Sequence, residues 1–292
     1  MTLTFATVLT HIGHMPEPPK AAVQAINLLE DPTVPVAKAA EFIAMDQVLT
    51  AKLLRLSNSA YYGFQGKIST VNESIVRLGV NVVKCALYAS MMETSGLKIS
   101  PFFIELWKSA LFSAMLAKDV GQLLNHPRKD ICFTGGLLCD LGQILMNEAA
   151  EKIYPDLITA VRRNNACMAD IENELFGFNH SDVGAKLAEV WQLPPIYENV
   201  IRFHHRLPEV KTRILPEDFK LLLVVSTANA LSPLFSDDPH QAQIEFKLLK
   251  EFGLACHTET DFIDKISSQF DRYKRDGIQI SNAMFGAVAA AH

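Results

Sequence analysis

Helical periodicity runs along almost the whole chain and limits its possible folds more than any other feature. Apolar residues recur at intervals of three and four, whereas alternation of apolar and polar residues over four or more positions is hard to find. The β-branched pair Val224-Val225 lies inside an uninterrupted helical pattern from Glu217 to Leu231. The sequence therefore predicts an all-α protein of about a dozen helices.

Helix-start signals occur where this periodicity requires them. Asp46 precedes an apolar stripe that begins at Val48, and an aspartate in that position accepts hydrogen bonds from the free amides of a helix start. Thr70 and Glu73 have the spacing of a capping box, in which each side chain accepts a bond from a backbone amide. Further start signals are Ser100-Pro101, Asp238-Pro239 and Thr258 with Asp261.

The charge balance argues against a nucleic-acid partner. Lys and Arg number 27 against 32 Asp and Glu, which gives a net charge of −5 at pH 7. A dedicated nucleic-acid-binding protein needs a local excess of cations to neutralise phosphates. The densest basic stretch, from Arg202 to Arg213, is interrupted by Glu209 and is typical of a solvated helix end and loop.

Cysteine usage and apolar stretches indicate the compartment. The five cysteines are odd in number and include no Cys-x-x-Cys pair, which is typical of a reducing compartment. Met1 to His14 lacks the basic and apolar blocks of a signal peptide. The strongest apolar stretch, Leu221 to Leu231, is about half the ~20 residues that span a bilayer. We therefore expect a cytoplasmic protein with no membrane partner.

An acidic residue, Asp140, lies within the apolar segment from Gly135 to Gln143. If this segment is one helix, the residues three before and four after Asp140 are apolar, and the carboxylate points toward packed structure. A buried carboxylate is costly unless a cation, a metal ion or several hydrogen bonds hold it. The histidines that could serve as its partners are His180, His204 and His205.

Several segments share motifs with known protein families. Residues 135–143, Gly-Gly-Leu-Leu-Cys-Asp-Leu-Gly-Gln, resemble the Gly-Leu-Leu-His-Asp-Ile-Gly-Lys helix of HD-type metal-dependent phosphohydrolases, with Cys139 in place of the histidine. A more specific resemblance, to a single family, is found in residues 46–63 and 68–79. The same family pattern is found in residues 178–187, 191–194 and 204–205. From about residue 15 to about residue 231 the chain resembles the HDOD family, the HD-related output domains of bacterial signalling proteins.

We expect a single HDOD-like domain over residues 1–292. The resemblance implies that its fold is a multi-helix HD-like bundle with an N-terminal helical subdomain. No linker rich in Gly, Ser or Pro marks a domain cut. We expect an N-terminal helical subdomain over residues 15–95 and the HD-like bundle over residues 96–235. Residues 236–292 are expected to form a C-terminal extension, whose helices Pro239 to Phe252 and Thr258 to Lys274 dock on the bundle.

The resemblance also implies where an HD enzyme would hold its metal ions. Ser109 and Cys139 stand where the family has histidines, and Asn229 stands where it has the closing aspartate. Serine and asparagine are weak neutral ligands, so the ion that activates water would be poorly held. We therefore expect no catalytic residue and no bound metal. The positions of this degenerate HD site are Ser109, Cys139, Asp140, His180, His204, His205 and Asn229.

Two interpretations of the remaining polar residues stay open. In the first, Asp140 and the histidines form a hydrogen-bond network that fixes the packing of three helices, with Cys139 a small buried apolar side chain. In the second, Cys139, Asp140, His180 and one of His204 or His205 hold a divalent metal ion such as zinc. Neighbouring helical residues diverge by about 100°, which favours the first interpretation.

The function implied by the resemblance is that of a non-catalytic bacterial signal-transduction output or interaction module. The alternative is a metal-dependent phosphohydrolase, of phosphodiesterase or nucleotidase type, with a reduced metal site. Signalling protein partners are implied, whereas the sequence identifies neither the partner nor the oligomeric state. Without a metal ion, we expect a direct hydrogen bond from at least one imidazole to Asp140.

Overall fold

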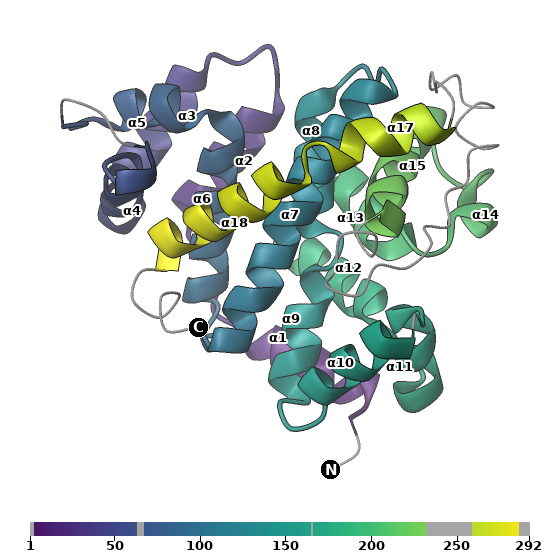
Figure 1. Cartoon of the computed structure of the whole chain (residues 1–292). Helices are drawn as coiled ribbons and strands as arrows, with labels where there is room; N and C mark the ends of the chain where they lie inside the picture. Colours follow the sequence, from purple (N-terminus) through teal and green to yellow (C-terminus); the bar gives the residue numbers. More distant parts are fainter. Residues whose placement is uncertain (1–2, 63–66, 165, 232–258, 286–292) are drawn as a thin grey trace. The chain divides into compact units, whose positions relative to one another are not determined.

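The computed structural model describes residues 3–62, 67–164, 166–231 and 259–285. This part of the chain is built from helices and contains no strand, which confirms the all-α prediction (Figure 1). The helices are α1 (Phe5–His14), α2 (Lys20–Glu30), α3 (Val36–Ala44), α4 (Gln47–Ser57), η1 (Ala60–Tyr62, a 3-10 helix), α5 (Val71–Leu78), α6 (Val80–Thr94), α7 (Pro101–Leu123), α8 (Lys129–Leu138), α9 (Leu141–Ala149), α10 (Tyr154–Asn164), α11 (Met168–Phe176), α12 (His180–Val190), α13 (Pro195–Phe203), α14 (Leu207–Val210), α15 (Pro216–Leu231), α17 (Glu259–Ser267) and α18 (Phe270–Phe285).

The local start signals define helix boundaries as expected. The Asp46 carboxylate accepts hydrogen bonds from the amides of Val48 and Leu49, at 2.9 and 3.0 Å, and begins α4. Thr70 and Glu73 form the capping box that begins α5. The signals at Asp238-Pro239 and Thr258, and the helix expected from Pro239 to Phe252, lie outside the described residues.

The chain divides into two compact units. One unit comprises residues 1–14 and 109–274, and the other comprises residues 15–108 and 275–292. The division falls within α7 and within α18, whereas the sequence places boundaries near residues 95 and 235. The expected division into subdomain, bundle and extension stays a prediction.

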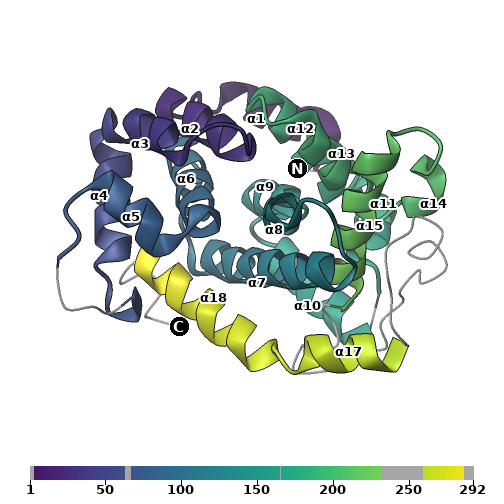
Figure 2. The same ribbon diagram turned by 90° about the horizontal axis from the view of Figure 1, so that it is seen from above.

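In the unit of residues 15–108 and 275–292, α2 packs against α3 and α6, and α4 packs against α5 (Figure 2). Lysine–glutamate ion pairs connect helices of this unit. Lys84, fully buried, lies 2.7 Å from Glu30, and Lys52 lies 2.8 Å from Glu93. Long basic side chains are buried only when paired, so these contacts hold the helices together.

In the unit of residues 1–14 and 109–274, α9 packs against α12, α12 against α13, and α8 against α15. Glycine permits the first of these contacts. A Cβ atom added to Gly142 of α9 would overlap the carbonyl oxygen of His180 and lie 2.7 Å from the amide nitrogen of Gly184. The backbones of α9 and α12 therefore touch directly, which places the ends of both helices side by side.

Among the described residues, no helix taken singly combines the length and apolarity of a bilayer span. The consecutive helices α5 and α6 meet both criteria only as a pair, and this pair bends by 114° at its junction.

Candidate functional site

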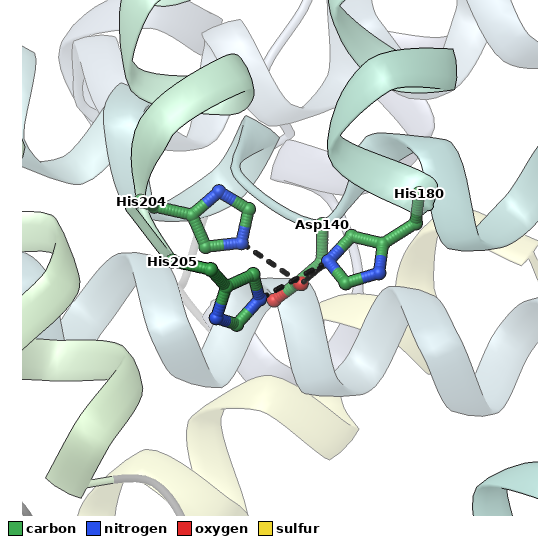
Figure 3. Close-up of side chains that lie close together, drawn as sticks. All are labelled: Asp140, His180, His204 and His205. Atoms are coloured by element: carbon green, nitrogen blue, oxygen red, sulfur yellow. Dashed lines mark hydrogen bonds and ion pairs between the residues drawn. The ribbon is translucent and has the colours of Figure 1, made fainter. Parts of the chain in front are cut away.

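Four polar side chains converge in the unit of residues 1–14 and 109–274. One potential ligand atom from each lies within 4.8 Å of the others, and Figure 3 shows the rings and the carboxylate turned toward one another. Asp140 lies between α8 and α9, His180 begins α12, and the two remaining histidines follow α13. We call Asp140, His180, His204 and His205 the four-donor cluster.

Asp140 lies at a break between helices, which corrects the expectation of one helix over residues 135–143. Helix α8 ends at Leu138 and α9 begins at Leu141, with Asp140 between them at φ −97° and ψ 15°. Aspartate disfavours helix interiors because its carboxylate bonds to nearby groups instead. Here the carboxylate accepts a hydrogen bond from Gln143 at 2.9 Å, and 27% of the side chain is exposed.

The distances within the four-donor cluster are short. Nε2 of His180 lies 3.3 Å from Oδ1 of Asp140, so the contact expected between an imidazole and this carboxylate is present. Nε2 of His204 lies 3.6 Å from the same oxygen. Nε2 of His205 lies 3.2 Å from Nε2 of His180, so both consecutive histidines face the cluster. The sequence leaves open which of His204 and His205 faces the site, and in the structure both of them do.

The other ring nitrogen, Nδ1, of both His180 and His204 contacts a group outside the four-donor cluster. Nδ1 of His180 lies 2.6 Å from Oε2 of Glu172, and Nδ1 of His204 lies 2.9 Å from the carbonyl oxygen of Ile201. Because a carbonyl oxygen only accepts, Nδ1 of His204 carries a hydrogen. Nε2 of His204 is buried and has no hydrogen-bond partner among the described residues.

The charges in the cluster are coupled. Burial alone would lower the pKa of His180, but the carboxylates of Glu172 and Asp140 outweigh it and raise this pKa to about 10. Burial would raise the pKa of Asp140, but His180 and His204 hold it well below its ordinary value. His180 is thus a cation between two carboxylates.

We expect the charge on His180 to make stability fall as pH rises. The folded-state pKa is about 10. The pKa of this histidine in the unfolded chain is roughly 6.5. The stability that the charge contributes is therefore complete below that pH. It is lost as the pH rises toward the folded-state pKa, at up to ~1.4 kcal/mol per pH unit. Urea unfolding at pH 6.0 to 7.5, below most cysteine titration, measures this change in stability. The stability difference between the wild type and His180→Gln should shrink with rising pH, and a constant or growing difference would contradict this.

Glu172, which the sequence analysis missed, is a fully buried carboxylate of α11. Its Oε2 accepts from the ring of His180 and, at 2.8 Å, from the backbone amide of the same residue, while Oε1 accepts from the hydroxyl of Tyr154. A signal for it exists in the sequence. Glu172 lies three residues after Ala169 and four before Phe176, so an acidic residue interrupts an apolar helix face.

Of the other expected site positions, Cys139 and Asn229 contact Asp140 without belonging to the four-donor cluster. Sγ of Cys139 is buried, 3.5 Å from Oδ2 of Asp140 and outside the four-donor cluster. Burial raises the pKa of this thiol well above its ordinary value, so it is an inert side chain. Nδ2 of Asn229 contacts Asp140 at 3.5 Å, whereas Ser109 is exposed on α7.

The four-donor cluster fits a divalent cation. Zinc binds imidazole nitrogen and carboxylate oxygen at about 2.0–2.2 Å, and four such ligands in a tetrahedron lie roughly 3.4 Å apart. Three of the six separations, 3.2, 3.3 and 3.6 Å, are close to this spacing, and all six are within 4.8 Å. Nε2 of His204 is buried, makes no hydrogen bond to a described residue and faces Asp140 at 3.6 Å, as expected of an imidazole prepared as a ligand. Such an ion would be held by Asp140 and the three histidines.

Comparisons with known proteins give a consistent result. The family described as HDOD domain matches residues 15–207. A relative from Treponema pallidum (strain Nichols), an uncharacterized protein, is 26% identical over 254 residues, which are 85% of this chain and 48% of that protein. This chain therefore spans about half the length of that relative.

Three solved structures share the fold. An HDOD domain protein of unknown function from Geobacter sulfurreducens has a TM-score of 0.68 and 21% identity, covering 94% of this chain and 98% of the other. A protein from Shewanella amazonensis SB2B, provisionally named a phosphohydrolase, has a TM-score of 0.67 and 20% identity, with 96% and 98% covered. A provisionally named signal transduction protein from Marinobacter aquaeolei VT8 has a TM-score of 0.72 and 17% identity, with 97% and 62% covered.

Proposed function

The chain belongs to the HDOD family, and from this premise we propose that it is a non-catalytic output or interaction module of bacterial signal transduction. The four-donor cluster is the observation that supports this most strongly. A hydrolytic metal centre keeps one coordination position open for water or substrate, whereas four protein ligands close a tetrahedral site. Asp140 and three imidazoles supply four ligands within 4.8 Å of one another. The arrangement suits holding helices together better than activating water.

The substituted positions support the same proposal. Asn229, which stands in place of the closing aspartate that the family resemblance implies, turns its neutral amide toward Asp140. An amide donor satisfies the carboxylate but adds no negative charge for a second cation. Ser109 is exposed on α7, and a serine hydroxyl is a weak neutral ligand. The cluster therefore has fewer carboxylates than a hydrolytic centre of HD type.

The second candidate is a metal-dependent phosphohydrolase. One observation favours it, because His205 is exposed and 27% of the Asp140 side chain is exposed, so solvent reaches the cluster. A histidine that moved aside would open a coordination position for water. Hydrolysis of a phosphodiester in the presence of Mn²⁺ or Zn²⁺ separates the two candidates, since only the second predicts turnover that depends on Asp140.

Asp140→Ala is expected to lower the free energy of unfolding by about 1–3 kcal/mol, and by up to ~5 kcal/mol if the ionised pair counts as fully buried. The reason is that the imidazolium of His180 loses one of its two carboxylate partners. Asn229→Ala and Ser109→Ala should cost less, because neither residue carries a charge. Urea unfolding of the three variants measures the ranking, and an unchanged midpoint for Asp140→Ala would contradict a structural network.

A further inference from the structure

We infer that Glu172 is a positioning residue for cation binding. It holds the ring of His180 so that Nε2 faces the four-donor cluster, and it thereby sets the affinity of the cluster for one divalent cation of the zinc class. This goes beyond the proposed function, which assigns no role to Glu172.

The geometry ties Glu172 to His180 at two points. Oε2 lies 2.6 Å from Nδ1 of the ring and 2.8 Å from the backbone amide nitrogen of the same residue. The glutamate side chain is 0% exposed, so water does not compete for these bonds. Both the position of the backbone and the rotation of the imidazole are therefore fixed by one carboxylate.

Glu172 is itself held in place. The hydroxyl of Tyr154, from α10, donates to Oε1. Burial and the neighbouring carboxylate raise the pKa of this hydroxyl well above its ordinary value, so it stays protonated and keeps donating. With one oxygen bound by α10 and the other by α12, the carboxylate has a fixed orientation between them.

This arrangement decides which ring nitrogen serves as the ligand. A carboxylate only accepts, so Nδ1 of His180 carries a hydrogen and Nε2 is the atom that faces Asp140, at 3.3 Å. Histidine ligands of metal ions commonly donate the other ring N–H to a carboxylate or carbonyl, which fixes the tautomer and raises ligand basicity. In the same way, Nδ1 of His204 donates to the carbonyl oxygen of Ile201, at 2.9 Å.

The charges favour a cation as well. Asp140 and Glu172 place two carboxylates on either side of His180, at 3.3 and 2.6 Å. A divalent cation at the cluster would replace the proton on Nε2, while the hydrogen on Nδ1 stays with Glu172. Glutamine at position 172 keeps the shape of the side chain but removes one of the two negative charges.

The test is titration of the full chain with Zn²⁺ and with Co²⁺, by calorimetry and by the visible absorption of bound Co²⁺. The wild type should bind one equivalent. Glu172→Gln should bind about 10–100-fold more weakly, the range found when such outer partners are removed. Glu174→Gln, the same change at an exposed position of the same helix, is the matched control and should bind as the wild type does.

Nitrogen-15 NMR of the histidine rings adds a measurement that loss of stability alone would not change. With one equivalent of zinc, His180 of the wild type should show a protonated Nδ1 and a bound Nε2, whereas His180 of Glu172→Gln should show, under the same conditions, a second signal from the ring without bound metal. If Glu172→Gln does not fold, Tyr154→Phe takes its place and should weaken binding by a smaller factor.

Absence of stoichiometric binding by the wild type would overturn the inference. Equal affinity in the wild type and Glu172→Gln, or in Tyr154→Phe where it takes that place, would do so as well. Phosphodiester turnover by the wild type would overturn the proposed non-catalytic function and leave this inference standing, so the two failures are distinguishable.

Discussion

Gly142→Ala is expected to destabilise the protein by ~4 kcal/mol or more, the upper range for overpacking, because the clash is with backbone and not with a flexible side chain. The new Cβ atom would overlap the carbonyl oxygen of His180 and approach the amide of Gly184. To relieve this, α9 and α12 would have to separate, and Asp140 would move away from His180. Urea and thermal unfolding measure the loss.

Gly13→Ala is the matched control. Gly13 is an exposed residue of α1 in the same unit, and a Cβ atom added there has no neighbour within 4 Å among the atoms considered. Alanine is favoured over glycine within a helix by roughly 0.5–1 kcal/mol, so this variant should equal or exceed the wild type in stability. Similar unfolding midpoints for both glycine variants would contradict the direct backbone contact between α9 and α12.

Glu172→Ala has the second largest expected effect, a loss of about 3–5 kcal/mol, which is typical when one partner of a buried charged pair is removed. The change leaves the imidazolium of His180 and the hydroxyl of Tyr154 without the oxygen atoms that accept their hydrogens. Denaturant unfolding at pH 7 measures the loss. Glu174→Ala, at an exposed position of the same helix, should stay within about 0.5 kcal/mol of the wild type.

A double variant separates pairing from packing. If Glu172 and His180 stabilise each other, Glu172→Ala combined with His180→Ala should cost less than the sum of the two single changes. The double variant leaves no unpaired charge at this contact. Strict additivity of the two changes would show that the pair contributes through volume alone.

Local signals in the sequence predicted part of the fold well. Asp46 and the Thr70–Glu73 box begin helices because a cap needs only residues within one turn. The break at Asp140 was missed, since the apolar pattern runs through it and the partners of its carboxylate include Asn229, far along the chain. Aspartate disfavours a helix interior, but the apolar pattern hides this local preference, and the contact with Asn229 is tertiary.

The sequence predicted only part of the candidate site. The histidines that approach Asp140 were named as its possible partners, but only the family resemblance implied that they lie nearby, since separate helix ends have no common periodicity to reveal it. Glu172 has no place in the motifs compared, and its role follows only from the packing of α11 beside α12. Ser109 was expected at the site from the same resemblance, yet its side chain is exposed on α7.

The most direct test of a non-catalytic role is hydrolysis of bis(p-nitrophenyl) phosphate by the full chain with added Mn²⁺, Zn²⁺ or Mg²⁺. We compare the wild type with Asp140→Asn, which removes the carboxylate charge, and with Ser109→Ala, an exposed control. The non-catalytic role predicts that all three proteins hydrolyse the substrate no faster than the metal ions alone. Saturable turnover by the wild type that persists in Ser109→Ala and disappears in Asp140→Asn would contradict it and establish the phosphohydrolase.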